Sequence, residues 1–247
     1  MKGIILAAGR GSRMGSLTDN LPKCRTEFLG KELIDWQLLA LKEAGINEIA
    51  IITGYLKETF EYQVTYFNNN RWSETNMVMT LMEAEEWLSK DECIVSYSDI
   101  CFSSRPIRKL MKDKSDFAIS YDPDWYNLWK VRMDDPLSDA ETFKLDTDSN
   151  IIEIGQKTDD LNDIRGQFMG LIKVTPTSFK DITKLLEERT QQERDKFDFT
   201  SLLNEMIKNN CKVRAVEIDD QWYEVDTEDD LNAYLKWRTP GNIFEKI

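Results

Sequence analysis

The sequence contains no histidine, and this absence narrows the chemistry that the chain can perform. It excludes Ser–His–Asp triads, imidazole general bases and most zinc sites. Its four cysteines show no Cys-x-x-Cys spacing, which is typical of reduced thiols in a cytoplasm. No apolar run is long enough to span a membrane, and the run at residues 3–8 is too short for a signal peptide. We therefore expect a cytoplasmic protein.

Positive charge is also scarce. Lys and Arg number 32 against 45 Asp and Glu, which gives a net charge of −13 at pH 7. This balance argues against nucleic acid or an anionic membrane as the main partner. The 247 residues, 41% of them hydrophobic, suffice for one α/β domain with a full core. An anionic ligand would need a local concentration of cations or a divalent metal.

The most informative stretch is residues 2–23, KGIILAAGRGSRMGSLTDNLPK. The apolar run at 3–8 predicts a buried strand, and a loop with three glycines follows it at 9–15. Glycine permits a tight turn and lets backbone N–H groups approach an anion. Arg13 and Lys23 add fixed positive charge beside this loop. Together these features predict a nucleoside triphosphate site.

Two commoner glycine motifs do not fit this stretch. A P-loop ends in Gly-Lys-Ser/Thr, which the sequence does not contain. A dinucleotide-binding G-x-G-x-x-G would have its third glycine where this chain has Met14. The acid expected about 20 residues further on would fall near Asp35, inside a helical pattern. A plain strand and turn without a ligand would not need the cluster of arginine and lysine.

Helical and strand patterns alternate in the first half of the chain. Helices are predicted at 32–45, 56–62 and 76–87, and strands at 48–53, 64–67, 94–99 and 117–120. The alternation predicts an α/β fold with a doubly wound, mostly parallel sheet covered on both faces. Ligands of such sheets lie beyond the carboxyl ends of the strands, where the glycine loop, Gly54-Tyr55 and Ser98-Asp99 fall.

The second half has weaker patterns. Residues 122–140 show no clear period and predict a long loop or insertion. The remaining predictions are a hairpin of 143–145 and 151–154, strands at 168–174 and 213–218, and helices at 177–189, 200–208 and 229–238.

The segment LAAGRGSRMGSLTDNLPKC resembles the signature of nucleotidyltransferases that make sugar nucleotides and CDP-alcohols, L-A-A-G-x-G-S/T-R followed by P-K. Ser12-Arg13-Met14 and Leu21-Pro22-Lys23-Cys24 are most similar to the phosphocholine cytidylyltransferase-like branch. The resemblance implies the Rossmann-like nucleotidyltransferase fold with a small acceptor-binding insertion. It divides this single domain into a nucleotide-binding half (1–120), an acceptor-binding half (121–230) and a C-terminal helix and tail (231–247).

The activity implied by this resemblance is transfer of CMP from CTP to the phosphate or phosphonate of a small acceptor, with release of pyrophosphate. The acceptor would be similar to phosphocholine, aminoethylphosphonate or a phosphorylated amino acid such as phosphoglutamine. The product would serve decoration of a bacterial capsule or other surface polysaccharide. No nucleic acid or membrane partner is implied, and a homodimer is compatible with the resemblance.

The resemblance also implies magnesium. Asp99 and Asp226, the latter within WYEVDTEDDL, would hold Mg2+, since hard cations take carboxylate and phosphate oxygens. This chain has Ser98 where the family often has glycine before the first aspartate. Asp229 and Asp230 are expected only to begin the last helix, because the helix dipole favours acids there.

The remaining site residues follow from the same resemblance. Arg13 would stabilise the leaving phosphates, Lys23 would bridge the α-phosphate and the acceptor, and Lys144 would meet the acceptor phosphate. The nucleotide would contact Leu6, Ala7, Ala8, Gly9, Gly11, Ser12, Gly54, Tyr55, Thr75, Asn76, Met77 and Ser98. The acceptor would contact Trp129, Arg132, Glu141 and Gln167. Arginine and amide groups suit a carboxylate or amide on the acceptor, whereas aromatic rings suit a quaternary ammonium, and the sequence leaves both open.

Three other functions remain open at this point. A sugar-1-phosphate nucleotidyltransferase using UTP or dTTP would share the fold and the loop. A glycosyltransferase would usually carry Asp-x-Asp after the central strand, but Asp99 is followed by Ile100 and Cys101. A non-catalytic nucleotide-sensing domain would not need both Lys23 and Asp226.

Overall fold

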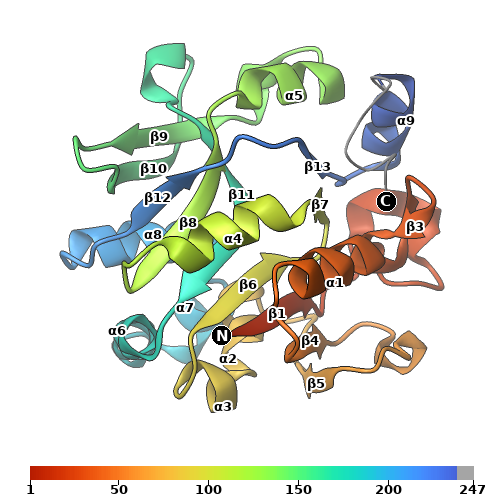
Figure 1. Ribbon diagram of the computed structural model, residues 1–247, viewed down its shortest axis with the longest axis horizontal. Coiled ribbons are helices and arrows are strands. Elements are labelled where there is room, and N and C mark those ends of the chain that lie inside the picture. Colours follow the sequence, from red (N-terminus) through yellow and green to blue (C-terminus); the bar gives the residue numbers. More distant parts are fainter. Residues whose placement is uncertain (238–247) are drawn as a thin grey trace.

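Seven strands form the central sheet of the protein, whose computed structural model describes residues 1–237 (Figure 1). In order across the sheet they are β12 (Arg214–Glu217), β8 (Phe117–Asp122), β11 (Gln167–Val174), β6 (Cys93–Tyr97), β1 (Lys2–Ala7), β4 (Ile49–Thr53) and β5 (Thr65–Asn68). Only β11 runs antiparallel to its neighbours within this sheet. The predicted α/β fold with a mostly parallel sheet is confirmed.

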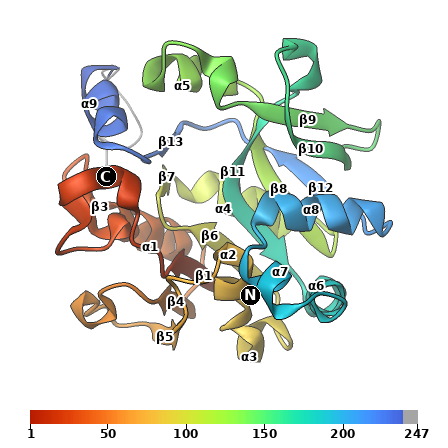
Figure 2. The same cartoon turned by 180° about the vertical axis from the view of Figure 1, so that it is seen from behind.

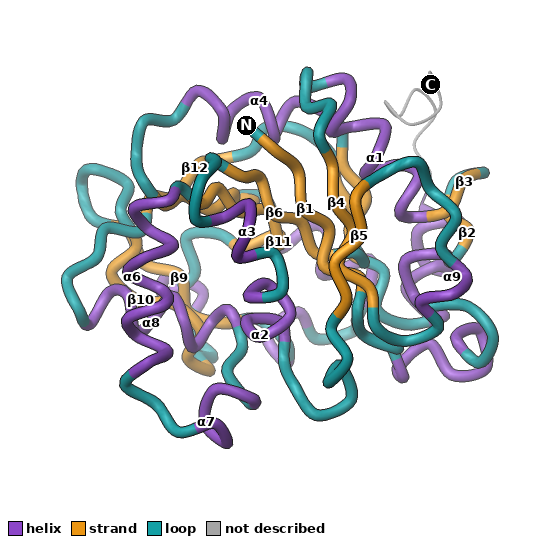
Figure 3. The backbone as a smooth tube through the Cα atoms, turned by 90° about the horizontal axis from the view of Figure 1, so that it is seen from below, coloured by secondary structure: helices purple, strands orange, loops and turns teal. Residues whose placement is uncertain are grey.

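Both faces of the sheet are covered. In the central strand β1, Ile5 packs into one hydrophobic core, whereas Ile4 and Leu6 pack into the other, because successive side chains point to opposite faces. Helices α1 (Leu33–Glu43) and α4 (Ser104–Lys112) cover the first face. The opposite face, seen in Figures 2 and 3, carries α2 (Met77–Met82), α3 (Glu85–Leu88), α6 (Pro176–Glu187) and α8 (Phe199–Lys208).

Two predicted helices of the first half differ from the structure. The helix expected at 56–62 is only a 3-10 turn, Lys57–Thr59, because Leu56 before it has a left-handed backbone with φ of 48°. The helix expected at 76–87 is divided into α2 and α3, since Ala84 between them departs from helical geometry with ψ of 20°. A short hairpin that was not predicted, β2 (Glu27–Phe28) with β3 (Lys31–Glu32), precedes α1.

The prediction of a loop at 122–140 was wrong. This stretch contains α5 (Trp125–Arg132) and a 3-10 turn, Pro136–Ser138. Trp125, Leu128 and Trp129 are buried at the i, i+3, i+4 spacing of one helix face. This eight-residue helix is flanked by Asp and Pro residues, so its period is too brief to stand out.

The rest of the second half follows the predicted order with two additions. The hairpin is confirmed as β9 (Glu141–Leu145) and β10 (Ile151–Lys157). The additions are α7 (Gln191–Asp195) and β13 (Trp222–Glu224), so β12 is not the last strand as expected. In the first half, β7 (Ile100–Phe102) and α4 were not predicted either. The last helix is α9 (Glu228–Trp237), and the tail predicted beyond it, 238–247, lies outside the described residues.

The pairing of β7 with β13 joins two distant parts of the chain. The strands are antiparallel, with Glu224 opposite Ile100, and the next backbone bond runs from the Val225 N–H to the Asp99 carbonyl at 2.9 Å. Asp99 and Asp226 are therefore brought to the same end of this ladder. Nothing local in either segment predicts the pairing, because strand partners are selected by the whole fold.

The glycine loop after β1 allows a close approach of the chain to itself. Gly11 has φ of 72°, and a Cβ added there would lie 2.5 Å from the Cβ of Lys23. The next residues form a 3-10 segment, Ser12–Thr18, in which Met14 is buried. Glycine at 11 is thus required both for the backbone angle and for the passage of the Lys23 side chain.

Two further expectations can be compared with the fold. Within residues 1–237 no helix has the length and apolar character needed to cross a bilayer. All four cysteines are free, and three of them are buried.

We predict that Gly11→Ala destabilises the protein by about 1–3 kcal/mol, because a left-handed alanine is strained and its Cβ overlaps Lys23. Gly9→Ala is the matched control, since a Cβ at Gly9 meets nothing within 4 Å. It should change the free energy of unfolding by no more than about 0.5 kcal/mol. Urea unfolding of both variants measures the difference, and equal stabilities would contradict the role assigned to Gly11.

Candidate active site

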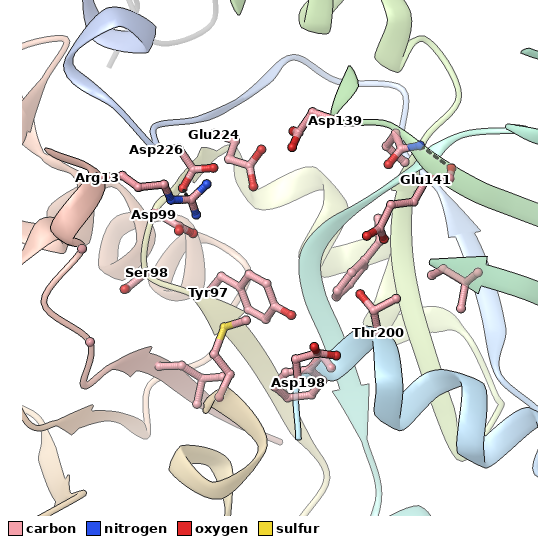
Figure 4. Close-up of a pocket in the computed structure, with 18 of the residues that line it drawn as sticks. Arg13, Tyr97, Ser98, Asp99, Asp139, Glu141, Asp198, Thr200, Glu224 and Asp226 are labelled. Atoms are coloured by element: carbon pink, nitrogen blue, oxygen red, sulfur yellow. Dashed lines mark hydrogen bonds and ion pairs between the residues drawn. The ribbon is translucent and has the colours of Figure 1, made fainter. Parts of the chain in front are cut away.

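A pocket of about 470 Å³ lies beyond the ends of β1 and β6 (Figure 4). Its walls come from the glycine loop, the turn after β6, the hairpin strand β9, the start of α8 and the segment after β13. This is the position where doubly wound sheets bind ligands.

One end of the pocket holds a compact charge cluster. The Lys23 ammonium donates to Asp99 Oδ2 at 2.8 Å and to Asp226 Oδ1 at 2.5 Å. Arg13 Nη2 lies 3.0 Å from the same Asp226 oxygen. Burial disfavours the charge on Lys23, but the two carboxylates outweigh it and raise the pKa of Lys23. Burial likewise disfavours the charge on Asp226, but Lys23, Arg13 and Arg132 together outweigh it and lower the pKa of that carboxyl.

The donor set at this end suits a hard divalent cation. Asp99 and Asp226 both contact one ammonium, so their carboxylates converge, and Asp99 Oδ1 is buried without a hydrogen-bond partner. A buried, unpartnered carboxylate oxygen is an available ligand for Mg2+. Across residues 1–237 no three His, Cys, Asp or Glu side chains form a metal site by themselves. A metal here would therefore depend on oxygens from a bound phosphate.

Behind this cluster lies Arg132, which the sequence analysis assigned to the acceptor. Its side chain is only 2% exposed and forms ion pairs with Glu224, Asp226 and Asp230. It is not among the residues that line the pocket. The geometry therefore favours support of Asp226 over direct contact with an acceptor.

Many of the other predicted residues do line the pocket. They are Leu6, Gly9, Gly11, Met77, Ser98, Trp129, Glu141 and Gln167. The Gln167 amide donates to the Glu141 carbonyl at 2.9 Å, which ties β11 to β9.

A second group of predicted residues lies outside the pocket lining, namely Ala7, Ala8, Ser12, Gly54, Tyr55, Thr75, Asn76 and Lys144. Tyr55 supports the glycine loop instead, because its N–H donates to the Ala8 carbonyl at 2.9 Å and its hydroxyl to the Thr18 carbonyl at 2.8 Å. The Asn76 side chain accepts from the Met77 N–H at the start of α2.

Lys144 has local partners as well. Its ammonium lies 3.1 Å from Glu153 and 3.0 Å from Asp163, which belong to β10 and to the turn after it. Direct contact of Lys144 with a ligand phosphate stays a prediction.

The far wall of the pocket was largely missed from the sequence. The residues that line the pocket there without having been predicted include Tyr97, Asp139, Thr142, Phe143, Phe168, Asp198, Phe199, Thr200 and Glu224. Four of them carried a usable signal. Glu224 shares the Glu-Val-Asp step with Asp226, and Asp139, Thr142 and Phe143 flank Glu141. The others belong to separate elements and meet only in the tertiary structure.

This far wall is acidic and partly aromatic. In Figure 4, Glu141 and Thr200 lie across the pocket from Arg13 and Asp226, with the Tyr97 ring between them. Burial raises the pKa of Glu141, and the negative charges of Asp139 and Asp198 raise it further. Among the described residues no lysine or arginine lies within ion-pair distance of these three carboxylates. The wall therefore carries negative charge without an ion-pair partner, although Asp198 also caps α8 by accepting the Ser201 N–H at 2.7 Å.

Comparison with known proteins agrees with this geometry. Residues 3–132 match the MobA-like NTP transferase domain. The CTP:phosphoglutamine cytidylyltransferase of Campylobacter jejuni is 36% identical over 96% of this chain and 100% of that protein. The choline-phosphate cytidylyltransferase of Haemophilus influenzae is 27% identical over 98% of this chain and 99% of that protein.

A solved structure shows the same architecture over nearly the whole chain. The CTP:phosphocholine cytidylyltransferase of Streptococcus pneumoniae superposes with a TM-score of 0.72 and 25% identity, covering 96% of this chain and 98% of that one. These relatives match nearly the whole chain, beyond the residues of the domain match. The chain therefore belongs to the family with the MobA-like NTP transferase domain, and it is a nucleotidyltransferase.

Proposed function

We propose that the protein transfers CMP from CTP to the phosphate or phosphonate of a small acceptor that carries a cationic amino group, and releases pyrophosphate. The observation that carries this proposal is that the two ends of one pocket have opposite charge. Lys23 and Arg13 stand at one end, and three carboxylates that form no ion pair stand at the other. The 36% identity to a phosphoglutamine cytidylyltransferase supports both CTP and a phosphorylated acceptor.

The chemistry requires two anions to meet. An acceptor oxygen forms a bond to the α-phosphorus of CTP while the bond from that phosphorus to the β-phosphate bridging oxygen breaks, and pyrophosphate leaves with the electron pair. A phosphate monoester is largely dianionic at pH 7, so the reaction needs no general base. Lys23 would neutralise charge where the reacting groups crowd, and Arg13 would bind the leaving phosphates.

Asp99 and Asp226 are the residues that would hold Mg2+. When bound, the metal would neutralise phosphate oxygens and orient the triphosphate. The unpartnered Asp99 Oδ1 supports this role. Lys23, which contacts both carboxylates, keeps their mutual repulsion low in the free protein.

The far wall favours acceptors with a positive group. Phosphocholine, aminoethylphosphonate and phosphoglutamine each join a phosphate or phosphonate to an amino or ammonium group. Asp139, Glu141 and Asp198 would face that group, and aromatic faces such as Tyr97 would add cation–π attraction. Hydroxyl groups also donate to carboxylates, so sugar 1-phosphates using UTP or dTTP are the competing substrates to test.

The cellular setting follows from the same proposal. We place the reaction in the cytoplasm, which agrees with four free thiols, and assign its product to decoration of a surface polysaccharide. A homodimer stays a prediction.

A substrate panel should identify the reaction. CTP, UTP, dTTP and ATP are each incubated with Mg2+ and with phosphocholine, aminoethylphosphonate, phosphoglutamine or glucose 1-phosphate, and pyrophosphate is measured. We expect the largest kcat/KM with CTP and an amino-bearing acceptor. A preference for a sugar 1-phosphate with UTP or dTTP would overturn the proposal.

Lys23→Met should lower kcat by about 10²–10³, which is typical for loss of one preorganised charge contact. Lys173→Met is the matched control, because Lys173 is also a buried lysine, and its ammonium donates to the Asp113 carbonyl outside the pocket. Lys173→Met should retain near-normal turnover once folding is verified.

Lys144→Met in the same assay decides whether Lys144 meets the acceptor phosphate, since only that role predicts a comparable fall in kcat.

Asp139→Asn and Glu141→Gln should each raise KM for amino-bearing acceptors about tenfold and leave KM for CTP unchanged. Asp134→Asn is the charge-matched control, because Asp134 is exposed and outside the pocket lining.

The raised pKa of Glu141 means that this carboxylate loses its charge at a higher pH than an ordinary glutamate. The acceptor KM should therefore rise as pH falls, less steeply in Glu141→Gln. Equal KM values in wild type and variants would exclude an ammonium site here.

A further inference from the structure

We propose that Arg132 is a positioning residue, which aims the carboxylate of Asp226 into the pocket. The inference rests on the proposed role of Asp226 as a metal-holding residue. Arg132 is not itself among the residues that line the pocket, since its side chain is 2% exposed and lies behind Asp226.

The two oxygens of Asp226 face opposite ways. Oδ1 accepts from Lys23 at 2.5 Å and lies 3.0 Å from Arg13, on the pocket side. Oδ2 lies 3.4 Å from Arg132 Nη2, on the buried side. Rotation of the carboxylate out of its plane would break the contacts on both sides, so the cations define its orientation.

The backbone of Asp226 is held through the same arginine. Asp230 Oδ2 accepts the N–H groups of Asp226 at 2.9 Å and Thr227 at 2.8 Å. Asp230 Oδ1 accepts from Arg132 Nε at 3.1 Å. Asp230 is 4% exposed and does more than begin α9, as the sequence analysis had expected. Arg132 thus orients the side chain of Asp226 directly and its main chain through Asp230.

A third contact of Arg132 involves strand β13. Arg132 Nη1 donates to Glu224, the last residue of that strand and a residue of the pocket wall. One guanidinium therefore pairs with three carboxylates that lie within seven residues of each other, Glu224, Asp226 and Asp230. Without it, these buried like charges would repel and the segment would open.

The anchor for Arg132 is α5, the helix that the sequence did not predict. The Arg132 guanidinium lies 5.1 Å from the centre of the Trp129 ring, and Trp129 is buried and lines the pocket. Lysine could not replace the arginine, because the donors of an ammonium all radiate from one nitrogen, whereas a guanidinium spreads its donors over three nitrogens in one plane.

The test uses Arg132→Lys, which keeps the charge, and Asp230→Asn, which keeps an oxygen for the two backbone N–H groups. Mn2+ is titrated by electron paramagnetic resonance into each folded variant with a non-hydrolysable CTP analogue. We expect apparent Mn2+ affinity to weaken 10- to 100-fold, as for partners that orient metal ligands. Turnover should fall with a smaller change in KM for CTP, and excess Mn2+ should partly restore it.

Arg189→Lys is the matched control. Arg189 also lies over an aromatic ring, Phe197, at 4.7 Å and pairs with an acid, Glu205, at 2.6 Å, but outside the pocket. Its Mn2+ affinity should equal that of wild type. Thermal unfolding confirms that each variant is folded, and Asp230→Asn decides the question if Arg132→Lys does not fold.

The outcomes separate the two proposals. If Asp226→Asn abolishes Mn2+ binding while folded Arg132→Lys and Asp230→Asn bind like wild type, the positioning role is overturned and the proposed function stands. If Asp226→Asn itself binds Mn2+ and turns over normally, the metal role assigned to Asp226 in the proposed function fails.

Discussion

The structure depends on one buried contact, the Lys23 ammonium between the carboxylates of Asp99 and Asp226. Lys23 is separated along the chain from Asp99 by 76 positions and from Asp226 by 203. Desolvating three charges is costly, and well-packed apolar residues would often be at least as stable. The contact therefore indicates a site for charged ligands. Two features make this contact possible. The β7–β13 ladder brings Asp99 and Asp226 together, and the absence of a Cβ at Gly11 leaves room for the Lys23 side chain.

The pocket resolves the apparent conflict between an acidic protein and an anionic nucleotide. The net charge of −13 describes the whole surface, whereas binding depends on the charges within a few ångströms. Lys23 and Arg13 make one end of the pocket cationic, and Asp139, Glu141 and Asp198 make the other end acidic. A polar pocket of this kind can align a molecule with a phosphate at one end and an amine at the other.

Sequence reasoning worked best where the signal was local. The strand β1, the glycine loop and Lys23 lie within one contiguous stretch, so residue order alone placed them together. The β9–β10 hairpin was equally accessible, since Asp146 caps its turn by accepting the N–H groups of Asp148 and Asn150. Helix α5 was missed because eight residues give little more than two periods. Arg132 then appeared to belong to a loop that could reach an acceptor.

What the sequence by itself determined was the fold class, the glycine loop and the pair of aspartates that a family motif connects. Only the tertiary structure decided that Lys23 lies between those aspartates, that Arg132 stands behind them, and that three carboxylates from β9, its approach and α8 share one wall. The physical reason is that backbone propensities and motifs act over a few neighbouring residues. Charges from different elements interact only after packing has brought them within a few ångströms and removed the water between them.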